Sequence, residues 1–99
     1  MLIALDYDDT YTADPELWLQ FVRDAQRRGH TVLCATMRYK HEGIDMDPRL
    51  LELVEVQFTD RRAKLPTLAS RNIKPDIWID DHPSYIVSDS VYSKGIITI

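Results

Sequence analysis

Short apolar runs alternate with helical stretches along this chain, and that alternation constrains its fold more than any other feature. A run that is apolar throughout is typical of a strand buried on both faces, and a run of alternating polarity is typical of a strand with one exposed face. Five segments have these patterns: LIAL at 2–5, TVLCA at 31–35, VEVQFT at 54–59, DIWI at 76–79 and GIITI at 95–99. The last segment could pair with YIVS at 85–88.

Helical signals fill the gaps between the first four runs. Asp14 is the expected N-cap of a first helix and Gly29 its stop, and a second helix is expected to begin near residue 47. Pro66 fits only in the first turn of a helix, which places the start of a third, shorter helix near Lys64. The apolar positions at helical spacing are Leu17, Phe21, Val22 and Ala25 in the first helix, and Leu50, Leu51 and Leu53 in the second.

Strands that alternate with helices imply a parallel sheet with right-handed crossovers and helices on both faces. We therefore predict an α/β, three-layer, Rossmann-like fold with a five-stranded, mainly parallel sheet in the order 5-4-1-2-3. A length of 99 residues allows one hydrophobic core, so residues 1–99 should form a single domain.

The composition excludes several classes of protein. A formal net charge of −4 argues against general binding to a nucleic-acid backbone. The single cysteine, Cys34, excludes an internal disulfide and is expected to lie in the core. No apolar run is long enough to cross a membrane, and no basic segment precedes an apolar one at residues 1–10. The expected location is the cytoplasm.

Polar side chains follow four of the predicted strands, at the edge where an open α/β sheet binds its ligands. Mg²⁺ prefers oxygen ligands, and a bound cation would offset the repulsion between neighbouring carboxylates. The sequence therefore predicts a magnesium site at this edge, with Thr36 offering a hydroxyl and Lys64 an ammonium to a bound phosphate. The residues concerned are Asp6, Asp8, Asp9 and Thr10, then Thr36 and Arg38, then Asp60, and finally Asp80, Asp81 and His82.

Three motifs in this order resemble those of the haloacid dehalogenase-like (HAD) phosphohydrolases. DYDDT at 6–10 resembles the first motif of that family, Thr36 at the end of a strand the second, and DIWIDD at 76–81 the fourth. The resemblance spans the whole chain. It implies the HAD-like fold, Mg²⁺ as cofactor and a phosphatase that works through an aspartyl-phosphate.

The resemblance also assigns a role to each matching residue. Asp6 would be the nucleophile, and Asp8 the general acid for the leaving oxygen and then the base for the hydrolytic water. Thr36 would donate a hydrogen bond to a phosphoryl oxygen. The metal would be held by the Asp6 carboxylate, the main-chain carbonyl of Asp8 and the fourth-motif acid, with Asp81 on the metal and Asp80 paired with the lysine.

The third-motif lysine has two candidates. Lys64 fits the usual position upstream of the fourth motif, and Lys40, in the loop after the second strand, is the reserve. Lys74 is discarded because a strand of about four residues, roughly 13 Å long, would separate it from the site. Thr10, Arg38 and Lys40 are the candidate ligands of the substrate, although an exposed loop cation is an equal interpretation of Arg38.

Only short loops stand where HAD enzymes insert cap domains, so no cap is expected and the site should be open. The expected partner is a phosphorylated small molecule or macromolecular end, and a chain of this size could be stabilised as a homodimer. The sequence does not identify the substrate. Asp9 is interpreted as a turn residue, and His41 and His82 as loop residues that face solvent.

Two alternatives use the same fold without this activity. A receiver-like signalling domain would carry its phosphoryl group after the third strand, on Asp60, but it would need Ser or Thr where this chain has Asp80. The second alternative is a catalytically silent binding module, because fold does not dictate function.

Overall fold

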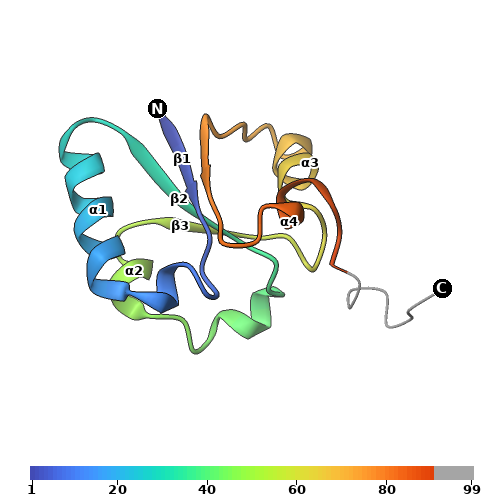
Figure 1. Ribbon diagram of the computed structural model, residues 1–99, viewed down its shortest axis with the longest axis horizontal. Helices are drawn as coiled ribbons and strands as arrows, with labels where there is room; N and C mark the ends of the chain where they lie inside the picture. Colours follow the sequence, from blue (N-terminus) through green and yellow to red (C-terminus); the bar gives the residue numbers. More distant parts are fainter. Residues whose placement is uncertain (91–99) are drawn as a thin grey trace.

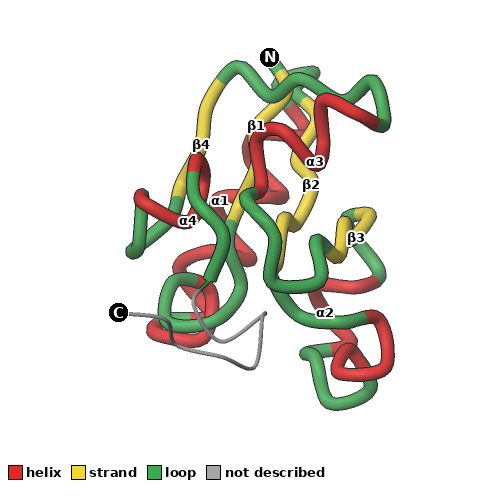
Figure 2. Tube along the Cα trace, turned by 90° about the vertical axis from the view of Figure 1, so that its right-hand side faces the viewer, coloured by secondary structure: helices red, strands yellow, loops and turns green. Residues whose placement is uncertain are grey.

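The computed structural model describes residues 1–90, which form one parallel sheet with helices on both faces. The described sheet has four strands in the order β3-β2-β1-β4. Their bounds are Leu2–Leu5 for β1, Thr31–Thr36 for β2, Glu55–Phe58 for β3 and Ile77–Ile79 for β4. Figure 2 shows β1 between β4 and β2, with β3 beyond β2. The class and the order predicted for the first four strands are confirmed.

The sheet differs from the prediction at its β4 end. The predicted fifth strand at 95–99 lies outside the described residues, and the described sheet has four strands instead of five. The prediction that YIVS pairs with that strand is wrong, because Ser84–Val87 form the short helix α4. Pro83 enters this helix with a helical φ of −59°, and a hydrogen bond from Ser88 N–H to the Ser84 carbonyl closes its turn. These local hydrogen bonds engage backbone groups that would have to pair with a neighbouring strand if the segment were part of the sheet.

The helices form the two outer layers of the fold. In Figure 1, α1 and α2 lie on one side of the sheet, and α3 and α4 lie on the other. The α-helices span Pro15–Arg27 (α1), Pro48–Leu51 (α2), Lys64–Ser70 (α3) and Ser84–Val87 (α4), and the short 3-10 helices Tyr11–Ala13 (η1) and Lys40–Gly43 (η2) follow β1 and β2. The Asp14 side chain accepts a hydrogen bond from Leu17 N–H, which confirms the predicted N-cap of α1.

The core is divided between the two faces of the sheet. Side chains of β1 alternate between them, so Ile3 and Leu5 pack under α1 and α2 while Ala4 packs with Leu68 of α3. Leu17 does not join this core: its exposed fraction is 53%, and Leu19 is buried instead. At 3.6 residues per turn, two positions rotate a side chain to nearly the opposite side of a helix, so only one of these leucines can face the sheet.

All four described strands are parallel, so the loops that follow them meet at one edge of the sheet. Two of these loops lead through 3-10 turns, and no inserted domain interrupts residues 1–90. No helix within this part of the chain is long and apolar enough to cross a membrane.

Candidate active site

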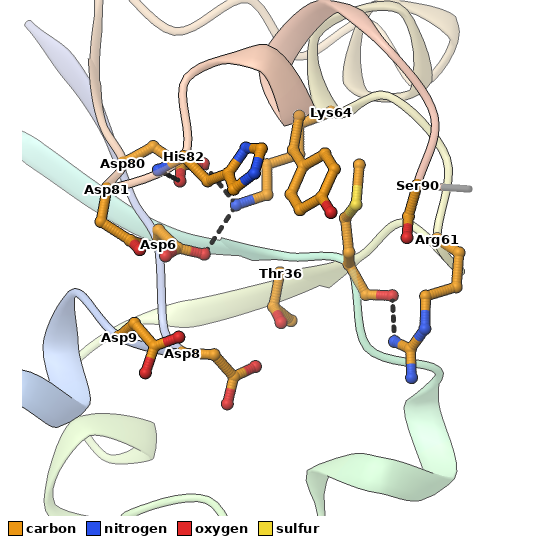
Figure 3. A pocket seen from close by; sticks show the side chains of 12 residues that line it. Asp6, Asp8, Asp9, Thr36, Arg61, Lys64, Asp80, Asp81, His82 and Ser90 are labelled. Atoms are coloured by element: carbon orange, nitrogen blue, oxygen red, sulfur yellow. Dashed lines mark hydrogen bonds and ion pairs between the residues drawn. The ribbon is translucent and has the colours of Figure 1, made fainter. Parts of the chain in front are cut away.

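A pocket of about 210 Å³ opens at the carboxyl ends of the strands. Figure 3 shows acidic side chains along one side of it and Arg61 with Ser90 along the other. Every described strand contributes a residue from the loop that follows it. The lining residues are Asp6, Asp8, Asp9, Thr36, Met37, Arg61, Lys64, Asp80, Asp81, His82, Tyr85 and Ser90.

Lys64 is the cation at the centre of the site. Its Nζ donates hydrogen bonds to Asp6 Oδ1 at 2.7 Å and to Asp80 Oδ2 at 2.6 Å, and its side chain is only 2% exposed. Because Lys64 is the first residue of α3, the loop after β3 delivers its side chain into the pocket. Lys40 is exposed on η2 and does not line the pocket. The structure thus brings Lys64, and not Lys40, to the predicted nucleophile.

Thr10 ties the end of β1 to the end of β4. Its Oγ1 lies 2.9 Å from Asp6 Oδ2 and 2.8 Å from Asp81 Oδ1, and it accepts a hydrogen bond from Asp81 N–H at 3.0 Å. A hydroxyl has a single hydrogen, so it can donate to only one of these carboxylates at a time. Thr10, predicted to bind substrate, is buried and bonded to the acidic residues themselves.

The acidic residues could hold a cation. Carboxylate oxygens of Asp6, Asp80 and Asp81 lie within 4.8 Å of one another, and oxygen is the ligand that Mg²⁺ prefers. Both oxygens of Asp80 already accept hydrogen bonds, one from Lys64 and one from His82 N–H. This matches the predicted pairing of Asp80 with the lysine. Between Asp80 and Asp81, Asp81 is the better-placed cation ligand, because the hydrogen bonds of residues 1–90 engage only one of its carboxylate oxygens.

Burial dominates the electrostatics of the predicted nucleophile. It raises the pKa of Asp6 from the ordinary 3.8 to about 7, although Lys64 opposes the shift. Burial also opposes the charge of Lys64, but the carboxylates of Asp6 and Asp80 outweigh it and raise the pKa of the ammonium. For Asp81, hydrogen bonds with Asp6 and Thr10 outweigh desolvation and lower the pKa of the carboxyl. The site therefore contains one acid that resists ionisation beside one that favours it.

Thr36 ends β2 with a buried hydroxyl in the pocket. Its Oγ1 accepts a hydrogen bond from Arg38 N–H at 3.2 Å. Among residues 1–90 no acceptor takes its own hydrogen, so the hydroxyl can donate to a ligand oxygen.

Arg38 holds the side chain of Asp8. Its Nε and Nη2 donate to the two carboxylate oxygens of Asp8 at 3.0 and 2.8 Å, and its Nη1 donates to the Glu42 carbonyl and to Asp45. These bonds engage four of the five donors of a guanidinium, and they raise the pKa of Arg38. In Figure 3 the carboxylate of Asp8 points away from Asp6. Arg38 itself, a predicted substrate ligand, does not line the pocket.

Sequence reasoning missed Arg61 as a pocket residue. Its backbone, with φ of 67°, follows Asp60 with φ of 56°, and Asp60 itself does not line the pocket. The signal that could have found Arg61 is its place in the loop after the third strand, one residue beyond the position that the strand-end rule singled out. Asp9, also at positive φ (64°), has the turn conformation that was predicted for it.

The buried core position predicted for Cys34 is confirmed. His41 is exposed as predicted, whereas the exposed His82 lines the pocket and stacks on Tyr85.

Comparison with models of protein families, with curated proteins and with solved structures finds no match for this chain. The geometry of the pocket is therefore the main guide to the function of this chain.

Proposed function

We propose that this protein is a Mg²⁺-dependent phosphohydrolase of the HAD type, which works through an aspartyl-phosphate on Asp6. The observation that carries the proposal is the contact set of Lys64, which joins Asp6 to Asp80 while Thr10 joins Asp6 to Asp81. Three segments far apart in sequence supply these groups. They are the residue types that the resemblance assigns to nucleophile, lysine and metal acids.

The pocket also offers donors for a phosphoryl group. Thr36 has a hydroxyl hydrogen to donate, and Lys64 has a third ammonium hydrogen beyond its two carboxylate bonds. Within residues 1–90, the backbone N–H groups of Tyr7 and Asp8 donate to no other backbone group. Donors that are fixed before the reaction stabilise the charge that develops on phosphoryl oxygens.

The proposed reaction has two steps on the residues of this chain. In the first, a carboxylate oxygen of Asp6 bonds to phosphorus, and the ester oxygen departs with a proton from Asp8. In the second step, the oxygen of a water molecule bonds to the same phosphorus, and Asp8 takes a proton from that water. The bond to Asp6 then breaks, which releases inorganic phosphate and restores the carboxylate.

The donor set of the site fits Mg²⁺. Asp6 and Asp81 would hold the ion through carboxylate oxygens, with the main-chain carbonyl of Asp8 as the third ligand that the resemblance implies. When bound, the ion supplies positive charge that neutralises the phosphoryl oxygens. Asp8 must turn from Arg38 to serve the leaving group, and its side chain, 50% exposed, is free of the packing that would prevent this.

The test is phosphate release by the purified chain from p-nitrophenyl phosphate, with and without Mg²⁺. We expect Mg²⁺-dependent turnover that falls at least 1,000-fold, on the order of the loss of a catalytic nucleophile, in Asp6→Asn. Asp60→Asn is the matched control, because it makes the same chemical change at the same sheet edge outside the pocket. It should retain wild-type turnover.

The alternatives give different results in the same experiment. A receiver-like domain would accept a phosphoryl group on Asp60 and lose it in Asp60→Asn. A silent module would release no phosphate from any ester and would bind no phosphate mimic in a metal-dependent way, which would end the enzyme proposal.

A further inference from the structure

Arg61 is a pocket cation that the proposed reaction does not use. It lies across the pocket from Asp6 in Figure 3, on the loop that leads from β3 to Lys64. Its Nη1 donates to the Met37 carbonyl at 2.7 Å and its Nη2 to Glu42 Oε2 at 2.9 Å. A guanidinium has five N–H donors, so within the described part of the chain three of them remain for a ligand.

The loop fixes the guanidinium before any ligand arrives. Asp60 and Arg61 both have left-handed backbone, at φ of 56° and 67°, a conformation that is unfavourable for residues other than glycine. Hydrogen bonds hold this turn: Arg61 N–H donates to the Met37 carbonyl at 2.8 Å, and Ser90 N–H donates to the Arg61 carbonyl at 2.9 Å. The guanidinium also lies 5.2 Å from the centre of the Tyr39 ring. A group positioned in this way loses little conformational freedom on binding.

A second hollow adjoins the pocket and shares Asp8 and Arg61 with it. Its volume is about 530 Å³, and the loop after β2 supplies its other wall, including Arg38 and the 94% exposed Ile44. The acids of this wall, Glu42 and Asp45, are ion-paired with Arg61 and Arg38. The pocket alone, at about 210 Å³, is smaller than the roughly 300 Å³ at which ligand sites usually begin. A substrate whose phosphate reaches Asp6 would thus extend past Arg61 into this hollow.

We propose that Arg61 binds a second anionic group on the leaving-group side of the substrate. The inference rests on the proposed function, and it narrows the substrate to phosphomonoesters that carry a carboxylate or a further phosphate close to the ester. Planar, two-pronged donors suit both of these oxyanions. Arg38 cannot take this role, because four of its donors are engaged with Asp8, Asp45 and the Glu42 carbonyl.

The experiment compares kcat/KM for three substrates with Mg²⁺ present: ethyl phosphate, 2-phosphoglycolate and ethylene glycol bisphosphate. We expect the wild-type chain to prefer at least one of the two anionic esters by about tenfold or more, the size of a charge-assisted hydrogen bond. Comparison of 2-phosphoglycolate with ethylene glycol bisphosphate shows whether the site binds a carboxylate or a phosphate. Arg61→Gln should abolish that preference, mainly by raising KM for the anionic ester.

Two further variants keep the test decisive. Arg62→Gln removes the same charge from the neighbouring, exposed position, which does not line the pocket, and should leave the preference intact. Arg61→Lys keeps the charge and should retain part of the preference even if Arg61→Gln unfolds. The inference is overturned if the wild-type chain hydrolyses all three esters equally, or if Arg61→Gln and Arg61→Lys leave the preference unchanged. Absence of all turnover by the wild-type chain would instead reject the proposed function.

Discussion

At the scale of single residues, the site consists of charges that are costly to bury and that stabilise one another only in part. Lys64 compensates Asp6 and Asp80, yet burial still raises the pKa of Asp6 to about 7. A metal-free chain at neutral pH therefore has a carboxyl group that would be more stable with a proton or a cation on it.

The first prediction concerns the pH dependence of stability without metal. The pKa of folded Asp6, about 7, exceeds its ordinary value of 3.8, so the folded state holds this proton more tightly than the unfolded state. The protonated Asp6 therefore stabilises the folded state. This stabilisation is fully present below pH 3.8 and is lost as the pH rises through about 7. The side chain of Asp6→Asn cannot ionise, so this variant does not lose stability at position 6 as the pH rises. Between pH 4 and 8, urea unfolding in EDTA should show the free energy of unfolding of Asp6→Asn rising by a few kcal/mol relative to that of the wild type. Parallel pH profiles of the two proteins would contradict this prediction.

The second prediction separates the two lysines. Lys64→Met leaves two buried carboxylates without their cation, and we expect the free energy of unfolding at pH 8 to fall by about 3 kcal/mol. The same substitution at the exposed Lys40 should change it by less than about 0.5 kcal/mol. Thermal unfolding measures both variants. Equal destabilisation would show that the carboxylates do not depend on Lys64.

At the scale of elements, patterns with a local physical cause were the predictable ones. The first four predicted strands and the Asp14 cap of α1 follow from burial and capping, and both are confirmed. The prediction for Leu17 is wrong because Leu17 and Leu19, two positions apart, can each join a helical stripe, and only packing on the sheet decides between them. The strand expected at 85–88 failed because apolar residues do not distinguish a short strand from one turn of helix.

The third prediction tests the cap of α1. Asp14→Ala removes the acceptor of the Leu17 N–H and should lower the free energy of unfolding by about 1 kcal/mol, without a change in phosphate release. Chemical denaturation and the phosphatase assay on the same preparation check both parts. Asp14→Asn is the control, since asparagine caps helices about as well. If Asp14→Ala lost activity at temperatures where it stays folded, the prediction that this cap affects stability alone would be wrong.

At the scale of the whole molecule, the parallel topology explains why so much of the site could be predicted. Four strands with the same direction bring Asp6, Thr36 and Asp80 to one edge, whatever the details of their loops, and the loop between β3 and α3 adds Lys64. The loop after the third strand also points to the neighbourhood of Arg61, but the place of this residue in the pocket depends on the left-handed backbone of Asp60 and Arg61, which no sequence pattern marks. Homodimer formation and the cytoplasmic location stay predictions.

A search for a phosphoryl group on Asp6 tests whether the reaction passes through an aspartyl-phosphate. Asp8→Asn, which lacks the base for the second step, should accumulate the aspartyl-phosphate, since p-nitrophenolate leaves without needing a proton. Rapid quenching in acid and peptide mass spectrometry would then find a phosphorylated Asp6 when Mg²⁺ is present, and none in Asp6→Asn. Phosphate release by the wild-type chain with no phosphorylated Asp6 in Asp8→Asn, or a phosphoryl group on Asp60, would show that Asp6 is not the nucleophile.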